Sequence, residues 1–391
     1  MAKSSAVRRV GVLAGVVGLI GAGVVFGQGR ILPGGGDGGG GEYGEGVGVH
    51  GERVSVVGFG SCHKLGNSHE VWDAVNAVKD GEGPDVWVWL GDNVYADTED
   101  MGEMRAKYER LRSLDGVDEL FRESVVLGTW DDHDYGANDA GAEYPKRAES
   151  QEALLDFLEE PRLSWRRETP GVYDAEVFGP GGERVQIILR DTRYFRSELS
   201  RREHGEWPDW TNGAAGRYVP RWDTDATMLG EDQWEWLEAR LREPADVRLI
   251  CSSIQVVAED HGFEKWANLP RERARLFDLI RRTGAEGVVF LSGDRHRAEL
   301  SLFDDERGMP GGGAGVGYDL YDLTSSALNA SGGRWVNELN RHRVGSQYLR
   351  NNFGVVEIDW ESRPVTVEMR VHGEDGRVVI RHRVSLDDLR R

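Results

Sequence analysis

Residues that can bind metal ions follow several short apolar runs in the sequence. Cys62, Asp92 and Asp294 each stand within three residues of the end of such a run. A carboxylate has two oxygens and can bridge two ions about 3.5–4 Å apart, so Asp92 is the natural bridging ligand. A single Gly-Asp pair would indicate only a turn. The recurrence of such residues after separate apolar runs is what predicts a metal site.

Further candidate ligands stand close to these positions. A thiolate from Cys62 with a phenolate from Tyr95 suits a transition metal such as ferric iron better than magnesium. The neutral amide oxygen of Asn138 suits a hard ion such as calcium. Asp294 and His296 alternate at the exit of an expected strand, so both side chains can point to the same side. Together these residues predict a cluster of more than one ion.

Arg193 is a candidate for binding a phosphate group. A guanidinium matches two phosphate oxygens, and Asp191 could hold it in place. A buried Asp–Arg ion pair between two strands is the alternative. Cys62 and Tyr95 have structural alternatives as well, as a small buried hydrophobe and a core aromatic.

The elements that must position these residues alternate between strands and helices. The apolar runs are rich in β-branched and aromatic residues, which is typical of strands covered on both faces. Helices are expected between them, for example over 103–114, 232–241 and 271–282, and in the last two apolar side chains recur at helical spacing. In an α/β sheet, ligands bind beyond the carboxyl ends of the strands. We therefore expect the polar residues to meet at one edge. Residues 352–384 predict antiparallel strands instead.

The composition narrows the class of protein. The chain has 391 residues and a formal net charge of −20, with 39% hydrophobic residues. A compact α/β body is expected, and the acid excess argues against proteins that scan nucleic acid, because the phosphate backbone would be repelled. Two cysteines cannot form a disulfide framework.

The N-terminus predicts an exported protein. Basic residues precede an uncharged run over 10–26, which is typical of a signal peptide or an N-terminal membrane anchor within residues 1–30. Residues 31–51 are glycine-rich and predict a flexible linker. Residues 52–391 have uniform composition and are expected to form a single catalytic domain. The expected location is periplasmic or extracellular, with the N-terminal segment in contact with the membrane or the export machinery.

Six segments resemble one known family in their order along the chain. They are FGSC (59–62), LGDNVYAD (90–97), TWDDHDYGAND (129–139), LRDTRYFR (189–196), FEKWANLPRERARLFDLI (263–280) and LSGDRHRAEL (291–300). The set resembles the alkaline phosphatase D (PhoD-like) branch of the calcineurin-like metallophosphatase superfamily. The resemblance implies an α/β sandwich of two mixed β-sheets flanked by helices, with a metal cluster at the strand ends.

The resemblance also implies roles for two residues of the third segment. Asp132 occupies the place of a metal ligand, and His133 the place of a catalytic imidazole that stabilises negative charge or protonates the leaving alkoxide. Helix capping or a salt bridge is the alternative for either. In the family the ions are iron, Fe(3+), with calcium, Ca(2+). The residue equivalent to the lone histidine of the superfamily is open between Ser253 and Gln255.

The expected function is metal-dependent hydrolysis of phosphate esters, by in-line attack of a metal-bound hydroxide on phosphorus. The bound cations would reverse the local field of an acidic protein and so attract a phosphoester substrate. The substrate stays open among monoesters, diesters, phospholipids and cell-wall polymers, as does the oligomeric state. The alternative is a non-catalytic exported binding protein with the same fold, which would use the Trp-rich segment 207–222 to bind its ligand.

Overall fold

The computed structural model describes residues 47–203, 216–307, 315–332 and 338–391. The expected signal or anchor segment, most of the expected linker and much of the Trp-rich segment lie outside these residues. Within them, no helix combines the length and the apolar character needed to cross a bilayer. The predicted export of the protein therefore stays a prediction.

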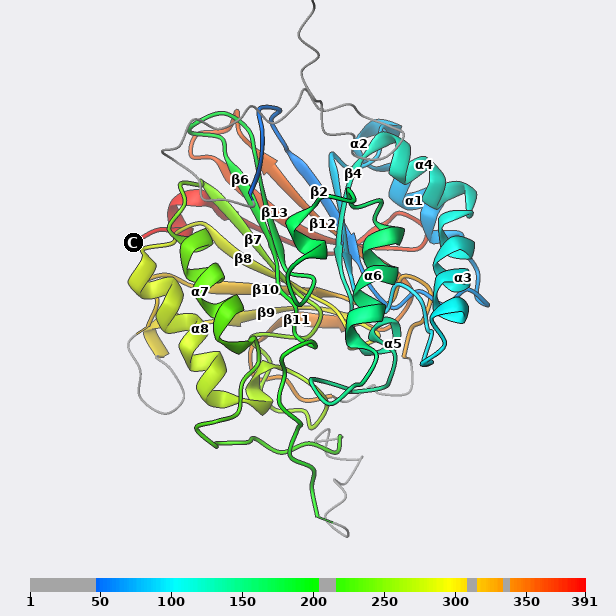
Figure 1. Cartoon of the computed structure of the whole chain (residues 1–391). Coiled ribbons are helices and arrows are strands. Elements are labelled where there is room, and N and C mark those ends of the chain that lie inside the picture. Colours follow the sequence, from blue (N-terminus) through cyan, green and yellow to red (C-terminus); the bar gives the residue numbers. More distant parts are fainter. Residues whose placement is uncertain (1–46, 204–215, 308–314, 333–337) are drawn as a thin grey trace, which may run out of the picture.

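Two mixed β-sheets pack face to face, and helices cover their outer faces (Figure 1). The six-stranded sheet has the order β14 (Val378–Ser385), β13 (Thr366–Gly373), β12 (Asn352–Asp359), β2 (Val56–Gly60), β3 (Val86–Leu90), β4 (Val125–Thr129). The strands β2, β3 and β4 run parallel, and β12 joins them antiparallel to β2. Strands from both ends of the described chain thus form one sheet.

The eight-stranded sheet contributes the other half of the sandwich. Its order is β1 (Gly48–His50), β5 (Asp174–Phe178), β6 (Val185–Leu189), β7 (Val247–Ser252), β8 (Val288–Ser292), β10 (Leu320–Ser325), β9 (Ala298–Phe303), β11 (Arg343–Tyr348). The central strands β6, β7, β8 and β10 are parallel. Their carboxyl ends therefore lie at the same edge of the sheet.

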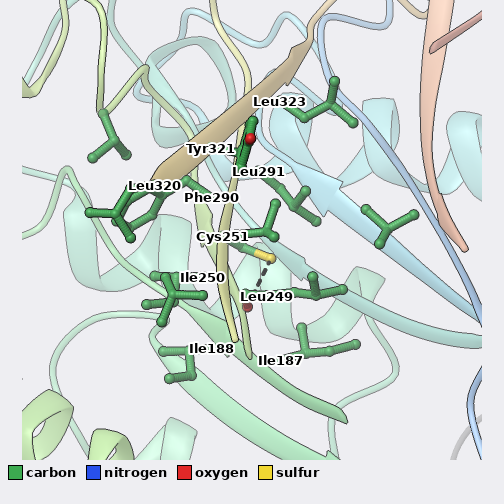
Figure 2. Close-up of a cluster of buried hydrophobic side chains, with 14 of the residues drawn as sticks. Ile187, Ile188, Leu249, Ile250, Cys251, Phe290, Leu291, Leu320, Tyr321 and Leu323 are labelled. Atoms are coloured by element: carbon green, nitrogen blue, oxygen red, sulfur yellow. Dashed lines mark hydrogen bonds between the residues drawn. The ribbon is translucent and has the colours of Figure 1, made fainter. Parts of the chain in front are cut away.

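The core lies between the two sheets and beneath the helices. Side chains of β6, β7, β8 and β10 form a dense apolar cluster that includes Ile187, Ile250 and Phe290 (Figure 2). The same cluster contains Val57 and Val88 from the six-stranded sheet, so the two sheets share one core. Continuous burial on both faces explains why these strands read as unbroken apolar runs.

Two groups of helices cover the sandwich (Figure 1). Against the six-stranded sheet lie α1 (Val71–Asn76), α2 (Val78–Gly81), α3 (Met101–Arg112), α4 (Asp115–Glu123), α6 (Arg147–Phe157). Against the eight-stranded sheet lie α7 (Gly230–Leu241) and α8 (Pro270–Thr283). Local signals set their ends: the Asp100 side chain caps the first N–H groups of α3, and α8 begins with Pro270 and ends at Gly284.

The structure confirms the predicted α/β sandwich of two mixed sheets flanked by helices and corrects two details. The expected linker 31–51 ends earlier than predicted, because residues 48–50 form β1 and pair with β5. The buried His50 contacts Glu176 and stacks on Phe178, and these contacts fix the strand. Strand β10 was missed because Asp322 interrupts its apolar pattern.

Gly91 allows β3 to end directly against the turn after β4. Its φ is +92°, and a Cβ there would overlap the backbone of Trp130 and Asp131. Gly182 also has a positive φ, +89°, but a Cβ there would meet no described atom within 4 Å. An alanine at either position would strain the backbone, but only at Gly91 would its side chain also overlap other atoms.

We expect Gly91→Ala to lower the free energy of unfolding by about 3–5 kcal/mol, since overpacking adds to the cost of a left-handed φ. Gly182→Ala should lower the free energy of unfolding by only about 1–2 kcal/mol, which is the cost of a left-handed φ without overpacking. Urea unfolding followed by circular dichroism measures both. Equal losses for the two variants would mean that the close approach at Gly91 contributes nothing.

Candidate metal centre

The candidate ligands follow the carboxyl ends of strands from both sheets. Cys62 follows β2, Asp92 follows β3, and Asp294 follows β8. Asp132 lies in the short helix α5 (Asp132–Tyr135) after β4, at the lower edge of the sandwich in Figure 1. The structure thus brings these four residues to one edge, as their positions after apolar runs predicted.

Strained backbone marks the same region. Nine non-glycine residues in the described part of the chain have positive φ, and six of them lie at this edge: Cys62, Asp92, Asp97, Asp139, Asp294, His296. Such conformations are costly for residues with a side chain and gather at functional sites. The loops therefore hold these side chains in directions that an unstrained backbone would not give.

Three overlapping groups of side chains have the spacing of metal ligands. Within each group the ligand atoms lie within 4.8 Å of one another. The groups are Cys62, Asp92, His296; Asp92, Asp132, His133; and Asp132, Asp139, Glu264. Asp92 belongs to the first two and Asp132 to the last two. This sharing suits a cluster of neighbouring ions, and the bridging role of Asp92 stays a prediction.

The first group is built around the buried thiol of Cys62. Its Sγ lies 3.5 Å from Oδ2 of Asp92 and 3.8 Å from the backbone oxygen of Asp294. The Tyr95 hydroxyl lies 3.2 Å from Nε2 of His296. The Nδ1 of His296 donates to the carbonyl of Ala330, which leaves the Nε2 lone pair directed toward Cys62 and Tyr95.

The second group combines Asp92 and Asp132 with His133. The backbone N–H of His133 donates to Oδ1 of Asp92 at 3.3 Å and to Oδ1 of Asp132 at 3.0 Å. The Nδ1 of His133 lies 2.6 Å from a carboxylate oxygen of Asp97. That hydrogen bond fixes the imidazole and leaves Nε2 free to act on a ligand.

The third group corrects the expectation for Asn138. Its side chain is exposed, whereas the next residue, Asp139, lies beside Asp132 and Glu264. The Asp139 backbone N–H donates to Oδ2 of Asp132 at 2.7 Å, and its carboxylate accepts from Tyr218 at 2.6 Å. The turn rotates Asn138 outward and Asp139 inward, so the carboxylate replaces the expected amide as the candidate ligand.

Asp134 joins the loops that carry Asp92 and Asp132. Its carboxylate accepts the N–H groups of Asp92 and Asn93 at 3.1 Å and of Asp131 at 2.7 Å. The Tyr108 hydroxyl is a fourth donor, at 3.2 Å. Asp134 therefore acts as a clamp between the ends of β3 and β4.

Arg193 lies outside the direct reach of a substrate in this structure. Its side chain is completely buried, with Nε 2.8 Å from an oxygen of Asp131 and Nη1 2.6 Å from an oxygen of Glu264. Asp191 accepts the backbone N–H of Arg193 and the indole N–H of Trp130. The structure therefore favours the alternative left open from the sequence, a buried ion pair, with Asp131 and Glu264 as the partners instead of Asp191.

The open choice between Ser253 and Gln255 concerns residues that are already occupied. Ser253 shares a 2.6 Å hydrogen bond with Thr192. The Gln255 amide donates to Glu299 and Thr324 and lies 2.9 Å from the ring of His261. Ser253 joins the loops after β6 and β7, Gln255 joins the loop after β7 to β9 and β10, and neither belongs to the three ligand groups.

The acidic groups around Cys62 resist ionisation, whereas Asp132 does not, because the charges of Arg193 and His133 outweigh burial and lower its pKa to about 2. Burial, together with the charge of neighbouring carboxylates, raises the pKa of Asp92 well above its usual value, and burial with the charge of Asp92 does the same for Cys62 and Tyr95. Burial raises the pKa of Asp294 to about 7. A cation among these groups would favour their ionised forms.

The donor set fits metal ions. A thiol, a phenol, an imidazole and carboxylates surround one end of the cluster, and carboxylates dominate the other. Sulfur, nitrogen and phenolate ligands suit a transition metal, and carboxylate oxygens suit a hard cation. Burial lowers the pKa of His296 to about 4, so its ring is neutral and its lone pair is available near neutral pH.

Several residues of the centre were not assigned from the sequence. Asp97, Asp139 and Glu264 lie inside segments that the resemblance singled out, but their roles depend on loop conformation. Their position in the sequence could have indicated such roles. Asp97 is the last residue of the segment that contains Asp92, and Asp139 is the last residue of the segment that contains His133.

Comparisons with known proteins bear on the family and the fold. The family model described as PhoD-like phosphatase matches residues 57–369. A solved structure of PhoD is similar to this chain with a TM-score of 0.57 at 16% sequence identity, over 84% of this chain and 72% of that one. No curated protein matches the sequence.

Metal binding should release protons, because the protonated acids of the centre must ionise to bind a cation. Asp294, with its pKa raised to about 7, is protonated below that pH and ionised above it. We expect the affinity for Mn²⁺ to rise with pH between about 6 and 8. Calorimetry of the metal-free protein in buffers of different ionisation enthalpy measures the release. Asp294→Asn should weaken this pH dependence. If the affinity for Mn²⁺ does not change with pH in either protein, the expected proton release is contradicted.

Proposed function

Since the chain belongs to the PhoD-like phosphatase family, we propose that it hydrolyses phosphate esters with metal ions held at the strand ends. The observation that supports this most directly is the continuity of the three ligand groups through Asp92 and Asp132. Buried acids without cations are unfavourable. Acids that belong to two neighbouring ligand groups are suited to holding two cations side by side.

We propose Fe(3+) with Ca(2+) as the ions. Cys62, Tyr95 and His296 would hold the iron, and Asp132 and Asp139 would hold calcium, with Asp92 between them. Glu264 lies beside the calcium ligands, but its carboxylate is already paired with Arg193 and Arg196. When bound, the ions would supply Lewis acidity, neutralise the phosphate and provide an activated water. The local positive charge would also let a protein with a net charge of −20 attract an anionic ester.

His133 is the proposed proton donor to the leaving oxygen. Burial acts to lower its pKa, but the charge of Asp92 and the hydrogen bond that the ring donates to Asp97 outweigh burial and raise it to about 10. Without bound ions the imidazole is therefore protonated at neutral pH, and neighbouring cations would lower this pKa. Its side chain is partly exposed, unlike the buried ligands around it, so Nε2 is accessible to a bound ester.

Export is part of the proposal, supported by the uncharged run over 10–26 after Arg8 and Arg9. The alternative of a non-catalytic binding protein is not favoured. The chain has three overlapping groups of candidate ligands together with a partly exposed histidine that is held by a carboxylate. A purely binding protein would have no need of that last contact.

We expect Asp92→Asn to lose bound metal and at least about a hundredfold in turnover, as when a ligand of a metal is removed. Elemental analysis and hydrolysis of p-nitrophenyl phosphate and its bis ester measure the two effects. The matched control is Asp278→Asn, an exposed carboxylate of α8 that pairs only with neighbouring arginines. Unchanged turnover of Asp92→Asn would refute the assignment.

Asp97→Asn should test the role of His133 separately from metal binding. Loss of the Asp97 charge lowers the pKa of His133, so the alkaline limb of kcat/KM should move to lower pH. We expect kcat to fall about tenfold to a hundredfold, within the range of general acid catalysis. Metal content should stay at the wild-type level. A pH profile identical to that of the wild type would rule out His133 as the acid.

A further inference from the structure

A cleft of about 520 Å³ lies beside the metal centre, between the loop after β2 and the exposed side of α3. Tyr95 lines it, together with Leu65 and Ala106. The basic residues Lys64 and Arg110 line the same cleft. No residue of this cleft other than Tyr95 has a role in the proposed reaction.

Two of the cations in this cleft lack acidic partners. Lys107 is satisfied, because its Nζ lies 2.8 Å from Glu103 and donates to two backbone carbonyls. Lys64 and Arg110 form no ion pair with any described residue, and both are exposed. Glu103, the only acidic residue of the lining, is occupied by Lys107. The cleft therefore carries net positive charge on a protein whose total charge is −20.

The cleft is connected to the centre through Tyr95. The Lys64 ammonium lies 4.4 Å from the centre of the Tyr95 ring. The hydroxyl of the same ring lies 3.2 Å from His296. One aromatic ring therefore separates the candidate ligands from the cations of the cleft.

The wall that carries Lys64 is built rigidly. The Asn329 side chain accepts the Lys64 N–H at 2.6 Å and donates to the Lys64 carbonyl at 3.0 Å. The Asn67 amide donates to the Asn329 backbone at 2.7 Å. A loop held in this way does not need to be ordered when a ligand binds, which favours affinity.

We propose that Lys64 and Arg110 form a subsite for a second negative charge on the phosphoester substrate. This charge is carried at the end of an arm, a substituent of the phosphate that the metal centre binds. This inference rests on the proposed function. The aliphatic and aromatic parts of the lining contact the arm, and the two cations select for a fixed anionic group at its end. Esters with a neutral arm of the same size are the poorer substrates.

The test compares two esters that differ only in charge. One carries a 3-sulfopropyl arm and the other a 3-sulfamoylpropyl arm, which is nearly the same size and neutral. They are prepared as monoesters or as propyl diesters, according to which p-nitrophenyl substrate the enzyme hydrolyses. Release of either alcohol is measured by chromatography, so the orientation of a diester does not matter. The readout is the ratio of kcat/KM for the two esters.

We expect the wild-type holoenzyme to prefer the sulfonate about tenfold at low salt, as two nearby cations allow. The preference should shrink at high salt. Arg110→Glu should abolish it. The control is Arg105→Glu on the same helix, which changes the net charge equally but lies outside the cleft and pairs weakly with Asp156. Lys64 is less suitable for substitution because it contacts Tyr95.

A wild-type ratio near one would overturn the subsite. So would equal losses in Arg110→Glu and Arg105→Glu, because the effect would then come from the total charge. If neither p-nitrophenyl substrate nor either test ester is hydrolysed by the metal-loaded enzyme, the proposed function itself fails. Hydrolysis of both test esters without a charge preference refutes only the subsite.

Discussion

The structure depends on balancing negative charge that is buried where the two sheets meet. Carboxylates at this edge come from several loops, and water is largely excluded from them. Part of the balance comes from the protein, because Arg193 lies between Asp131 and Glu264. Around Asp92 the neighbours are the Cys62 thiol, further acids and His133 as the one nearby basic residue that affects its pKa. Buried charge of one sign is unfavourable, so this part of the edge calls for cations from solution.

The clamp by Asp134 shows how the fold tolerates this concentration of acid. Its carboxylate is surrounded by N–H and O–H donors and holds the turns after β3 and β4 together. Both Asp134 and Asp132 accept backbone N–H groups. The difference lies in their other neighbours: Asp134 accepts the Tyr108 hydroxyl, whereas Asp132 lies beside the acids Asp139 and Glu264.

Much of this could be predicted from the sequence. Parallel strands bring their carboxyl ends to one edge, so the positions of Cys62, Asp92 and Asp294 after apolar runs indicated a shared site. Asp139 and Glu264 could not be placed in this way, because a turn in the loop decides whether Asn138 or Asp139 faces inward. The partner of Arg193 was likewise set by packing between loops distant in sequence.

The pairing of β12 with β2 has a consequence for the order of assembly. Strand β2 leads to Cys62, yet its neighbour on one side is made of residues 352–359, near the other end of the described chain. A ribosome delivers Cys62 and Asp92 long before that neighbour exists, and such distant pairings form slowly. Ions captured by the emerging chain would meet ligands without a framework. Stable binding of the proposed metal ions therefore requires that β12 has paired with β2, because this pairing completes the sheet that positions Cys62 and Asp92.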